Sequence, residues 1–474
     1  MRVLLLLLAM PSWAAGTLLG QRPDSLGEEV RKYVALDTAA VALTHAVLLD
    51  GTGGAPKTDQ TILIRSGRIA DVGPAARVRV PDGAVTMDLS GQTVIPGLVG
   101  LHNHLFYTAA GGRAAQMSYT GPRLYLASGV TTIRTAGGRS PYAEINLREN
   151  VNRGLVPGPR IHLTAPYITG AEGGGSMDVV TSPEEARRFV AYWASEGATW
   201  IKAYTDIRRA ELSAAIKEAH RRGVKVTGHL CSVSFREAVD LGIDNLEHGM
   251  LTASDFDSSK QPDVCPVSVI GRNNSADVKS ETARSVIQAM VRRKVSMTST
   301  LAVYEPFVAN RPTKDPRVLQ AMSPEVRASY MKIRHEIDST GSGPVAAEGL
   351  TAAMAFEKEF FEAGGLLAAG VDPTGLGGAL AGYGDQRNYE LLIEAGFSPV
   401  QTIQIMTLNG ARILGVQRRL GSVEAGKLAD LVVLKGDLTR DPATIRNPTL
   451  VFKDGVGYDP AKLIASIEGR VGID

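Results

Sequence analysis

VIPGLVGLHNHL, residues 94–105, is an apolar run of strand composition that ends in two histidines, His102 and His104. In a β-strand successive side chains point to opposite faces, so these two imidazoles project to the same side and can hold one metal ion. Two solvated histidines on a surface strand would give the same pattern. The rest of the chain has to decide between these two interpretations.

Length and composition describe an ordinary globular enzyme. A chain of 474 residues predicts two or three domains, or one large barrel with attachments. Hydrophobic residues make up 44% and charged residues 21% of the chain, which argues against long disorder. The formal net charge is only +2, from 51 basic and 49 acidic residues, so no net field would recruit nucleic acid. We therefore expect no nucleic-acid partner.

The first residues have the composition of a secretory signal. Arg2 precedes the unbroken apolar run 3–10, and the small-residue sequence 12–14 follows it. This order predicts a signal peptide over residues 1–14, cleaved after Ala14. The apolar run is too short to span a bilayer, and no other stretch is long or apolar enough. We expect an exported protein, periplasmic or secreted, without a membrane partner after cleavage.

The chain has two cysteines, Cys231 and Cys265. Export makes a disulfide between them chemically possible. Two separate buried thiols are the alternative, and the sequence does not decide between the two.

Between residues 94 and 410 the chain repeats one unit: a short apolar strand, a loop and an amphipathic helix. The predicted strands are 94–101, 130–134, 160–164, 200–203, 225–228, 245–247, 295–298 and 366–371. Eight such units predict an α/β fold of the (β/α)8 TIM barrel type. Short strands with turn dipeptides occupy 15–93 and return at 411–474, so both chain ends are expected to form one small β-sandwich domain into which the barrel is inserted.

Polar side chains stand where the predicted barrel strands end, which is the face that carries the active site in such barrels. Four of the eight histidines are among them. Each of these side chains could be a satisfied core group, a surface lysine or a helix cap, but their joint occurrence at ordered strand ends predicts a metal site. The predicted ligands are His102, His104, Lys202, His229, His248 and Asp372.

Lys202 is the most informative member of this set. It lies in the apolar strand TWIKAYT and should point inward, where an isolated ammonium group is costly to bury. Desolvation favours the neutral amine, which can add carbon dioxide and form a carbamate. The resulting N6-carboxylysine would be an anionic ligand able to bridge two metal ions. A buried Lys202 paired with Asp or Glu is the alternative.

The order of these residues resembles the amidohydrolase superfamily, in its binuclear branch with a carboxylated lysine. GVTTIRTAGG at 129–138 and IDNLEHG at 243–249 are similar to imidazolonepropionase-like and prolidase-like members, and GSVEAGKLADLVVL at 421–434 fits the family's closing segment. The resemblance implies that His102, His104 and Asp372 hold one metal, that His229 and His248 hold the other, and that carboxylated Lys202 bridges them. Thr135, where many relatives have an aspartate, and TGAEGGG at 169–175 depart from the pattern.

The chemistry expected of such a site is hydrolysis. Two divalent cations would lower the pKa of a bridging water towards neutrality and stabilise a tetrahedral oxyanion. Asp372 could accept the proton of the hydroxide and deliver it to the leaving nitrogen. Imidazole ligands favour zinc. Tyr204 could polarise the substrate carbonyl, with simple packing as the alternative, and Arg134 could bind a substrate carboxylate, with a structural salt bridge as the alternative.

The sequence therefore predicts an exported metal-dependent amidohydrolase that cleaves an amide C–N bond through a metal-bridging hydroxide. A dipeptide or an N-acyl amino acid is the expected substrate, as in prolidase-like dipeptidases. Hydrolysis of a cyclic amide or lactone at the same binuclear centre is one alternative. A catalytically silent metal-containing binding protein is another. The physiological substrate, the native metal and a homo-oligomeric state stay open.

Overall fold

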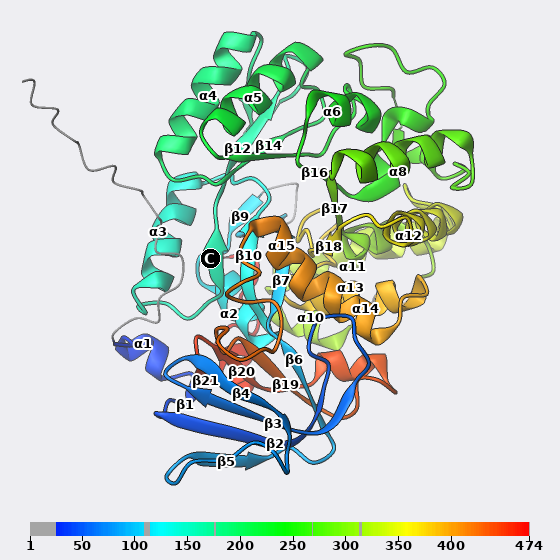
Figure 1. The fold of residues 1–474 in the computed structure, drawn as a ribbon. Helices are drawn as coiled ribbons and strands as arrows, with labels where there is room; N and C mark the ends of the chain where they lie inside the picture. The colour runs from blue at the N-terminus through cyan, green and yellow to red at the C-terminus, as the bar shows by residue number, and fades with distance from the viewer. Residues whose placement is uncertain (1–24, 109–113, 175–176, 268, 312–314, 474) are drawn as a thin grey trace, which may run out of the picture.

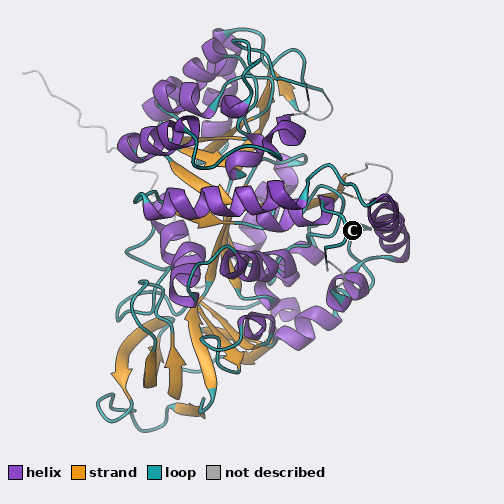
Figure 2. Cartoon of the chain, turned by 90° about the vertical axis from the view of Figure 1, so that its right-hand side faces the viewer, coloured by secondary structure: helices purple, strands orange, loops and turns teal. Residues whose placement is uncertain are grey.

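The computed structural model describes residues 25–108, 114–174, 177–267, 269–311 and 315–473. The predicted signal segment 1–14 lies outside them. The described chain has a mixed α/β fold: one sheet of nine strands lies at the bottom of Figure 1, and two parallel sheets with their covering helices lie above it. Figure 2 shows the same division, with most helices around the parallel strands.

Both chain ends contribute to the nine-stranded sheet, whose order is β1-β21-β20-β19-β6-β2-β3-β4, with β5 beside β2. Antiparallel pairing of β6 with β19, in which Val94 lies opposite Val433, joins the two ends. The strands form one hydrogen-bonded sheet, so the sandwich of two sheets stays a prediction. The bounds are β1 Val34–Leu36, β2 Ala40–Leu48, β3 Lys57–Arg65, β4 Arg68–Pro74, β5 Val85–Asp88, β6 Gln92–Pro96, β19 Leu431–Lys435, β20 Pro448–Lys453 and β21 Val456–Tyr458.

Apart from β13, neighbouring parallel strands in each sheet follow one another in chain order. One sheet has the order β11-β10-β7, and the other has the order β13-β12-β14-β15-β16-β17-β18. The bounds are β7 Leu98–Asn103, β10 Val130–Thr135, β11 Arg160–His162, β12 Thr164–Thr169, β13 Asp178–Val179, β14 Trp200–Ala203, β15 Lys225–Gly228, β16 Asn245–Glu247, β17 Ser296–Ser299 and β18 Leu367–Ala369. Strands β8 Phe106–Thr108 and β9 Ala114–Gln116 form a separate pair.

Two predicted strands are divided in the structure. The stretch 94–101 was wrongly taken as one strand: it divides at Gly97, so β6 belongs to the nine-stranded sheet and β7 to a parallel sheet. Gly97 lets the chain pass close to Thr131 at this point, because a Cβ there would lie 2.1 Å from Thr131 Oγ1. The stretch 160–164 divides at Leu163 into β11 and β12.

Hydrogen bonds join the two parallel sheets at two places. The amide of Asp372, just after β18, donates to the carbonyl of His102 on β7 at 2.8 Å. The amide of Thr164 on β12 donates to Thr135 Oγ1 on β10 at 2.9 Å. Strand ladders do not run without interruption around all eight positions in the described chain, so the closed barrel stays a prediction.

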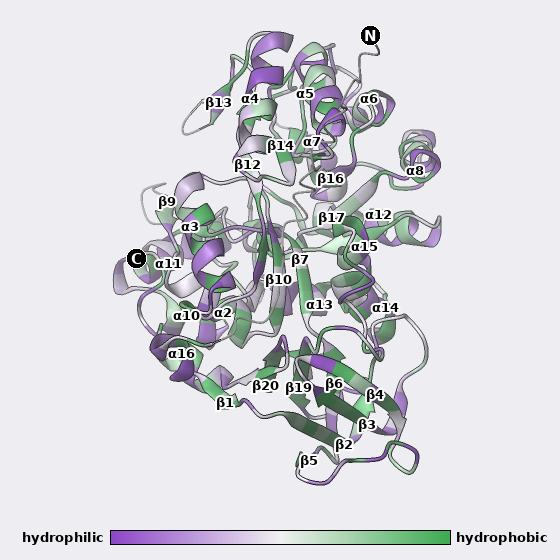
Figure 3. Ribbon diagram, turned by 60° about the vertical axis from the view of Figure 1, so that its left-hand side comes forward, coloured by the Kyte–Doolittle hydropathy of each residue, from purple (hydrophilic) through white to green (hydrophobic). Residues whose placement is uncertain are grey.

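Helices cover the outer side of the parallel strands (Figure 1). Figure 3 shows hydrophobic residues along β7 and hydrophilic residues on parts of outer helices such as α4 and α8. This arrangement buries the apolar helix faces against the strands. The longer helices are α2 Thr120–Ala127, α3 Pro141–Asn152, α4 Pro183–Ser195, α5 Arg209–Arg221, α6 Phe235–Leu241, α8 Glu281–Arg293, α11 Pro324–Thr340, α12 Ala347–Glu362 and α13 Tyr383–Glu394.

Short helices fill the connections. They are α1 Glu28–Arg31, η2 Gly249–Thr252, η3 Ser254–Phe256, α7 Val269–Asn273, α9 Leu301–Tyr304, η4 Glu305–Phe307, α10 Pro316–Ala321, α14 Pro399–Gln404, the π-helix η5 Ile405–Asn409, α15 Gly410–Leu414, η6 Pro442–Arg446 and α16 Pro460–Ala465. None of the helices in the described ranges has the length and apolar character needed to cross a membrane.

A disulfide joins Cys231 and Cys265, whose Cα atoms are 4.9 Å apart. Of the two possibilities that the sequence left open, the structure therefore has the disulfide. It ties the end of β15 to the long segment between β16 and α8.

Candidate metal centre

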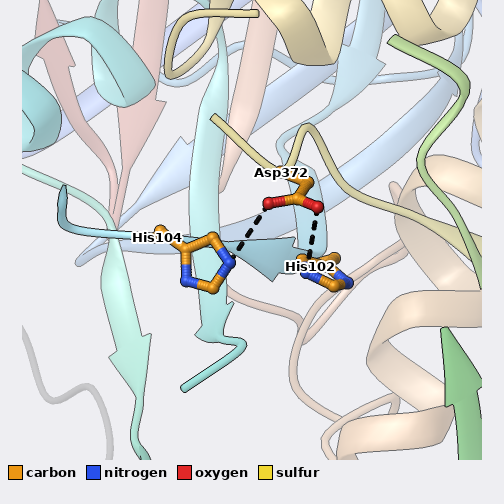
Figure 4. A group of neighbouring side chains, drawn as sticks. All are labelled: His102, His104 and Asp372. Atoms are coloured by element: carbon orange, nitrogen blue, oxygen red, sulfur yellow. Dashed lines mark ion pairs between the residues drawn. The ribbon is translucent and has the colours of Figure 1, made fainter. Parts of the chain in front are cut away.

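His102, His104 and Asp372 form the compact part of the site (Figure 4). Asp372 Oδ1 lies 3.2 Å from His104 Nε2, and its Oδ2 lies 3.5 Å from His102 Nε2. The ligand atoms of these three buried side chains all lie within 4.8 Å of one another. Among the described residues, no other group of three or more His, Cys, Asp or Glu side chains is as close. Their arrangement can hold one metal ion.

The other three predicted ligands lie in the same cavity, which has a volume of about 300 Å³. The ring centre of His248 is 4.5 Å from that of His102 and 4.4 Å from that of His229. Lys202, from β14, also lines the cavity. The fold thus brings all six side chains to one place, although they are spread over 270 positions of the sequence.

Burial sets the protonation of the ring nitrogens. It lowers the pKa of His229 to about 3 and keeps the pKa values of His102 and His248 well below the usual range. Burial by itself would raise the pKa of Asp372, but His102 and its neighbour His104 hold it below its ordinary value. The site therefore presents neutral imidazoles at these three histidines and an ionised carboxylate at Asp372, the forms in which both groups can donate electron pairs to a metal ion.

Lys202 is 1% exposed, and burial lowers the pKa of its amine to about 8. Its Nζ has no hydrogen-bond partner among the described residues. The nearest carboxylate oxygen, Oε1 of Glu247, is 4.0 Å away. The carboxylate pairing that the sequence left as an alternative is therefore a long contact rather than a hydrogen bond.

Glu247 is a central residue that the sequence analysis missed. Its buried carboxylate receives a hydrogen bond of 2.5 Å from Arg134 Nη2 and lies 2.8 Å from Nδ1 of His102. Burial would raise the pKa of Glu247, but Arg134 and Lys202 hold it below the ordinary value. The contact to Nδ1 leaves Nε2 of His102 facing Asp372, so Glu247 orients a candidate ligand. A carboxylate directly before a predicted ligand, in LEHG, was the available signal.

The substrate-binding role predicted for Arg134 is not what the structure indicates. Its side chain is fully buried, pairs with Glu247 and stacks on Trp200 with 4.6 Å between guanidinium carbon and ring centre. It does not line the cavity as far as the chain is described. The structure therefore has the structural salt bridge, which was the alternative that the sequence left open for Arg134.

Tyr204 does line the cavity, with its ring centre 4.7 Å from that of His229 and 5.2 Å from that of Tyr167. Burial raises the pKa of Tyr204 to about 12, so the phenol keeps its proton and can donate a hydrogen bond. Its action on a substrate carbonyl stays a prediction. The remaining lining residues are Phe106, Thr108, Arg139, Tyr167, Met177, Ile270, Val303, Tyr304, Phe307, Thr374 and Gly375.

Comparison with known proteins agrees with this geometry. The model of the amidohydrolase family matches residues 93–254 and 363–457, together more than half of the 474 residues. A dihydroorotase of Pelotomaculum thermopropionicum is 23% identical over 403 residues, which cover 81% of this chain and 87% of that protein. A solved structure of a candidate prolidase from Bifidobacterium longum is 27% identical, with a TM-score of 0.63 over 88% of this chain and 94% of that chain. A Xaa-Pro dipeptidase with bound methionine shares the fold at 20% identity, with a TM-score of 0.65 over 89% of this chain and 100% of that chain.

Proposed function

The chain belongs to the amidohydrolase family, and from this premise we propose that it is a metal-dependent hydrolase of an amide C–N bond in a dipeptide or an N-acyl amino acid. The observation that carries the proposal is the meeting of five metal-binding side chains and one buried lysine around a single cavity. Similarity to the candidate prolidase supports the choice of substrate class.

The donor set fits a pair of divalent cations, zinc being favoured by the imidazoles. His102, His104 and Asp372 would hold one ion, and His229 with His248 would hold the other. Lys202 would bridge them as N6-carboxylysine, formed by addition of carbon dioxide. The support for this modification is an amine that is buried without a hydrogen-bond partner in the described chain and whose pKa is lowered to about 8 by burial. When bound, the cations would polarise the amide carbonyl and lower the pKa of the attacking water.

Within this centre the side chains of the chain have separate tasks. Asp372 would accept a proton from the attacking water and return it to the leaving nitrogen as the C–N bond breaks, which yields a carboxylic acid and an amine. Tyr204 would donate a hydrogen bond to the carbonyl oxygen as it gains negative charge. Glu247 would keep His102 in one orientation through Nδ1.

Hydrolysis of a cyclic amide is the second candidate. Its support is the similarity to a dihydroorotase over 81% of this chain, because that name refers to a cyclic amide substrate. The same catalytic groups would serve both reactions, and the shape of the cavity would select between them. A metal-binding protein without turnover is the third, non-enzymatic candidate.

We also propose the organisation expected from the sequence: a signal peptide over 1–14, export, and a closed barrel over 94–410 inserted between the two parts, 15–93 and 411–474, of a β-sandwich domain. The disulfide between Cys231 and Cys265 supports export, since such bonds persist in oxidising compartments. Mass determination of the mature protein from culture fractions would test the cleavage after Ala14.

The test of the function combines metal analysis with a substrate screen. Purified protein should contain two divalent ions per chain and should cleave dipeptides or N-acyl amino acids. Lys202→Ala should lose bound metal and turnover together, whereas Lys217→Ala, at an exposed position on α5, should keep both. Full metal content and full turnover in Lys202→Ala would contradict the bridging role. Two bound metals without cleavage of any linear or cyclic amide would favour the binding protein.

A further inference from the structure

One end of the cavity carries a positive charge, that of Arg139. Arg139 follows β10, is exposed at the cavity rim, and its guanidinium carbon lies 5.3 Å from the ring centre of Phe106. The ring of Phe106 is 4.6 Å from that of His104, so this end adjoins the candidate metal centre. Arg139 has no carboxylate partner within the described part of the chain. Arg139 and the buried Lys202 are the two cationic side chains other than histidine among the described lining residues.

The guanidinium of Arg139 lines the same cavity as Tyr204 and Tyr167. An anionic group placed among these side chains would be attracted towards the Arg139 end of the cavity.

The end of the cavity at Tyr304 and Phe307 is apolar. The ring of Tyr304 lies 5.7 Å from that of His248 and 6.4 Å from that of Phe307. Val303 and Ile270 also line the cavity, and the described lining residues near Phe307 include no cation. Ring contacts thus run from the charged end, across the imidazoles, to the apolar end.

We propose that Arg139 is a specificity-determining residue that binds a free carboxylate of the substrate, while the apolar end receives a hydrophobic side chain. This inference rests on the proposed amide hydrolysis and narrows its substrate class to acylated amino acids and dipeptides with a free carboxylate. A guanidinium can bind a carboxylate through two parallel hydrogen bonds, and its stacking on Phe106 limits the freedom it loses on binding. The amide bond would lie between the two ends, above His102 and His104.

The test uses pairs of substrates that differ only in the terminal group: N-acyl amino acids and dipeptides as free acids and as carboxamides. Zinc-loaded wild-type protein should prefer the acids by about 10- to 100-fold in kcat/KM, the range of one hydrogen-bonded charge. Arg139→Met should remove this preference mainly through KM, with kcat for the bound acid changed only a few-fold. Arg139→Lys should keep part of the preference for acids. The control variant Arg187→Met, at an exposed position on α4, should keep the whole preference.

The outcomes separate this inference from the proposed function. Equal turnover of acids and carboxamides by the wild type, or an unchanged preference in Arg139→Met, would overturn the role of Arg139 and leave the hydrolase standing. If no pair is cleaved, the proposed function fails. The role of Arg139 is then tested by measuring, with calorimetry, how tightly the same acids and carboxamides bind. Tighter binding of the acid by wild type but not by Arg139→Met would support the inference, and equal binding would refute it.

Discussion

Replacing Glu247 by glutamine should destabilise the fold and weaken metal binding at the same time. The carboxylate is fully buried and faces two cationic side chains, Arg134 at 2.5 Å and Lys202 at 4.0 Å. It also contacts Nδ1 of His102 at 2.8 Å. Glutamine preserves the shape of the side chain and removes its charge, so the variant isolates the electrostatic contribution.

Two magnitudes follow from this geometry. Removal of one partner of a buried ion pair leaves the other charge uncompensated, which typically costs about 3–5 kcal/mol of folding free energy. Loss of a contact that orients a ligand imidazole lowers metal affinity about 10- to 100-fold. Glu184→Gln is the matched control, because Glu184 is 58% exposed and its 2.8 Å pair with Arg187 is a surface ion pair. That control should change the unfolding free energy by less than about 1 kcal/mol.

Urea unfolding of the metal-free proteins measures the first effect, and competition of zinc with a chromophoric chelator measures the second. The double variant Arg134→Met/Glu247→Gln should recover part of the lost stability, because it removes the stranded cation as well. If Glu247→Gln unfolds within about 1 kcal/mol of wild type and binds zinc equally well, Glu247 neither compensates Arg134 nor orients His102, and this reasoning is refuted.

Three further perturbations test other parts of the structure. Asp372→Asn should lower kcat by about 10²- to 10⁴-fold in metal-loaded protein with a smaller change in KM, because it removes the proton carrier; wild-type kcat would exclude Asp372 from the mechanism. Burial raises the pKa of Glu357 to about 8 from its ordinary 4.5, so the folded protein holds a proton that the unfolded chain releases between these values. Its contribution should therefore make stability fall by about 1.4 kcal/mol per pH unit as the pH rises through this window. Glu357→Gln should reduce that slope in urea titrations at several pH values, and an unchanged slope would contradict the burial effect. Replacement of both Cys231 and Cys265 by serine opens a loop with a sequence separation of 34 and should cost up to about 4 kcal/mol by chain entropy. Calorimetry that shows an unchanged Tm would rule out this contribution.

Local sequence pattern was sufficient for the strands and for the side chains that follow them. The predicted strands 200–203, 225–228 and 245–247 are β14, β15 and β16, because short apolar runs between polar segments identify buried parallel strands. The ends of parallel strands lie at one edge, so polar residues there could be expected in a common cavity.

The sequence by itself determined where most of the parallel strands lie and which polar residues follow them, since both depend on patterns over a few residues. Only the tertiary structure decided that Arg134 is buried and paired with Glu247, while Arg139, unpaired among the described residues, lines the cavity. The same holds for the division at Gly97, which places one apolar run in two sheets. These features depend on contacts between residues far apart in the chain and on the loss of water around them, and neither is encoded in the spacing of neighbouring residues.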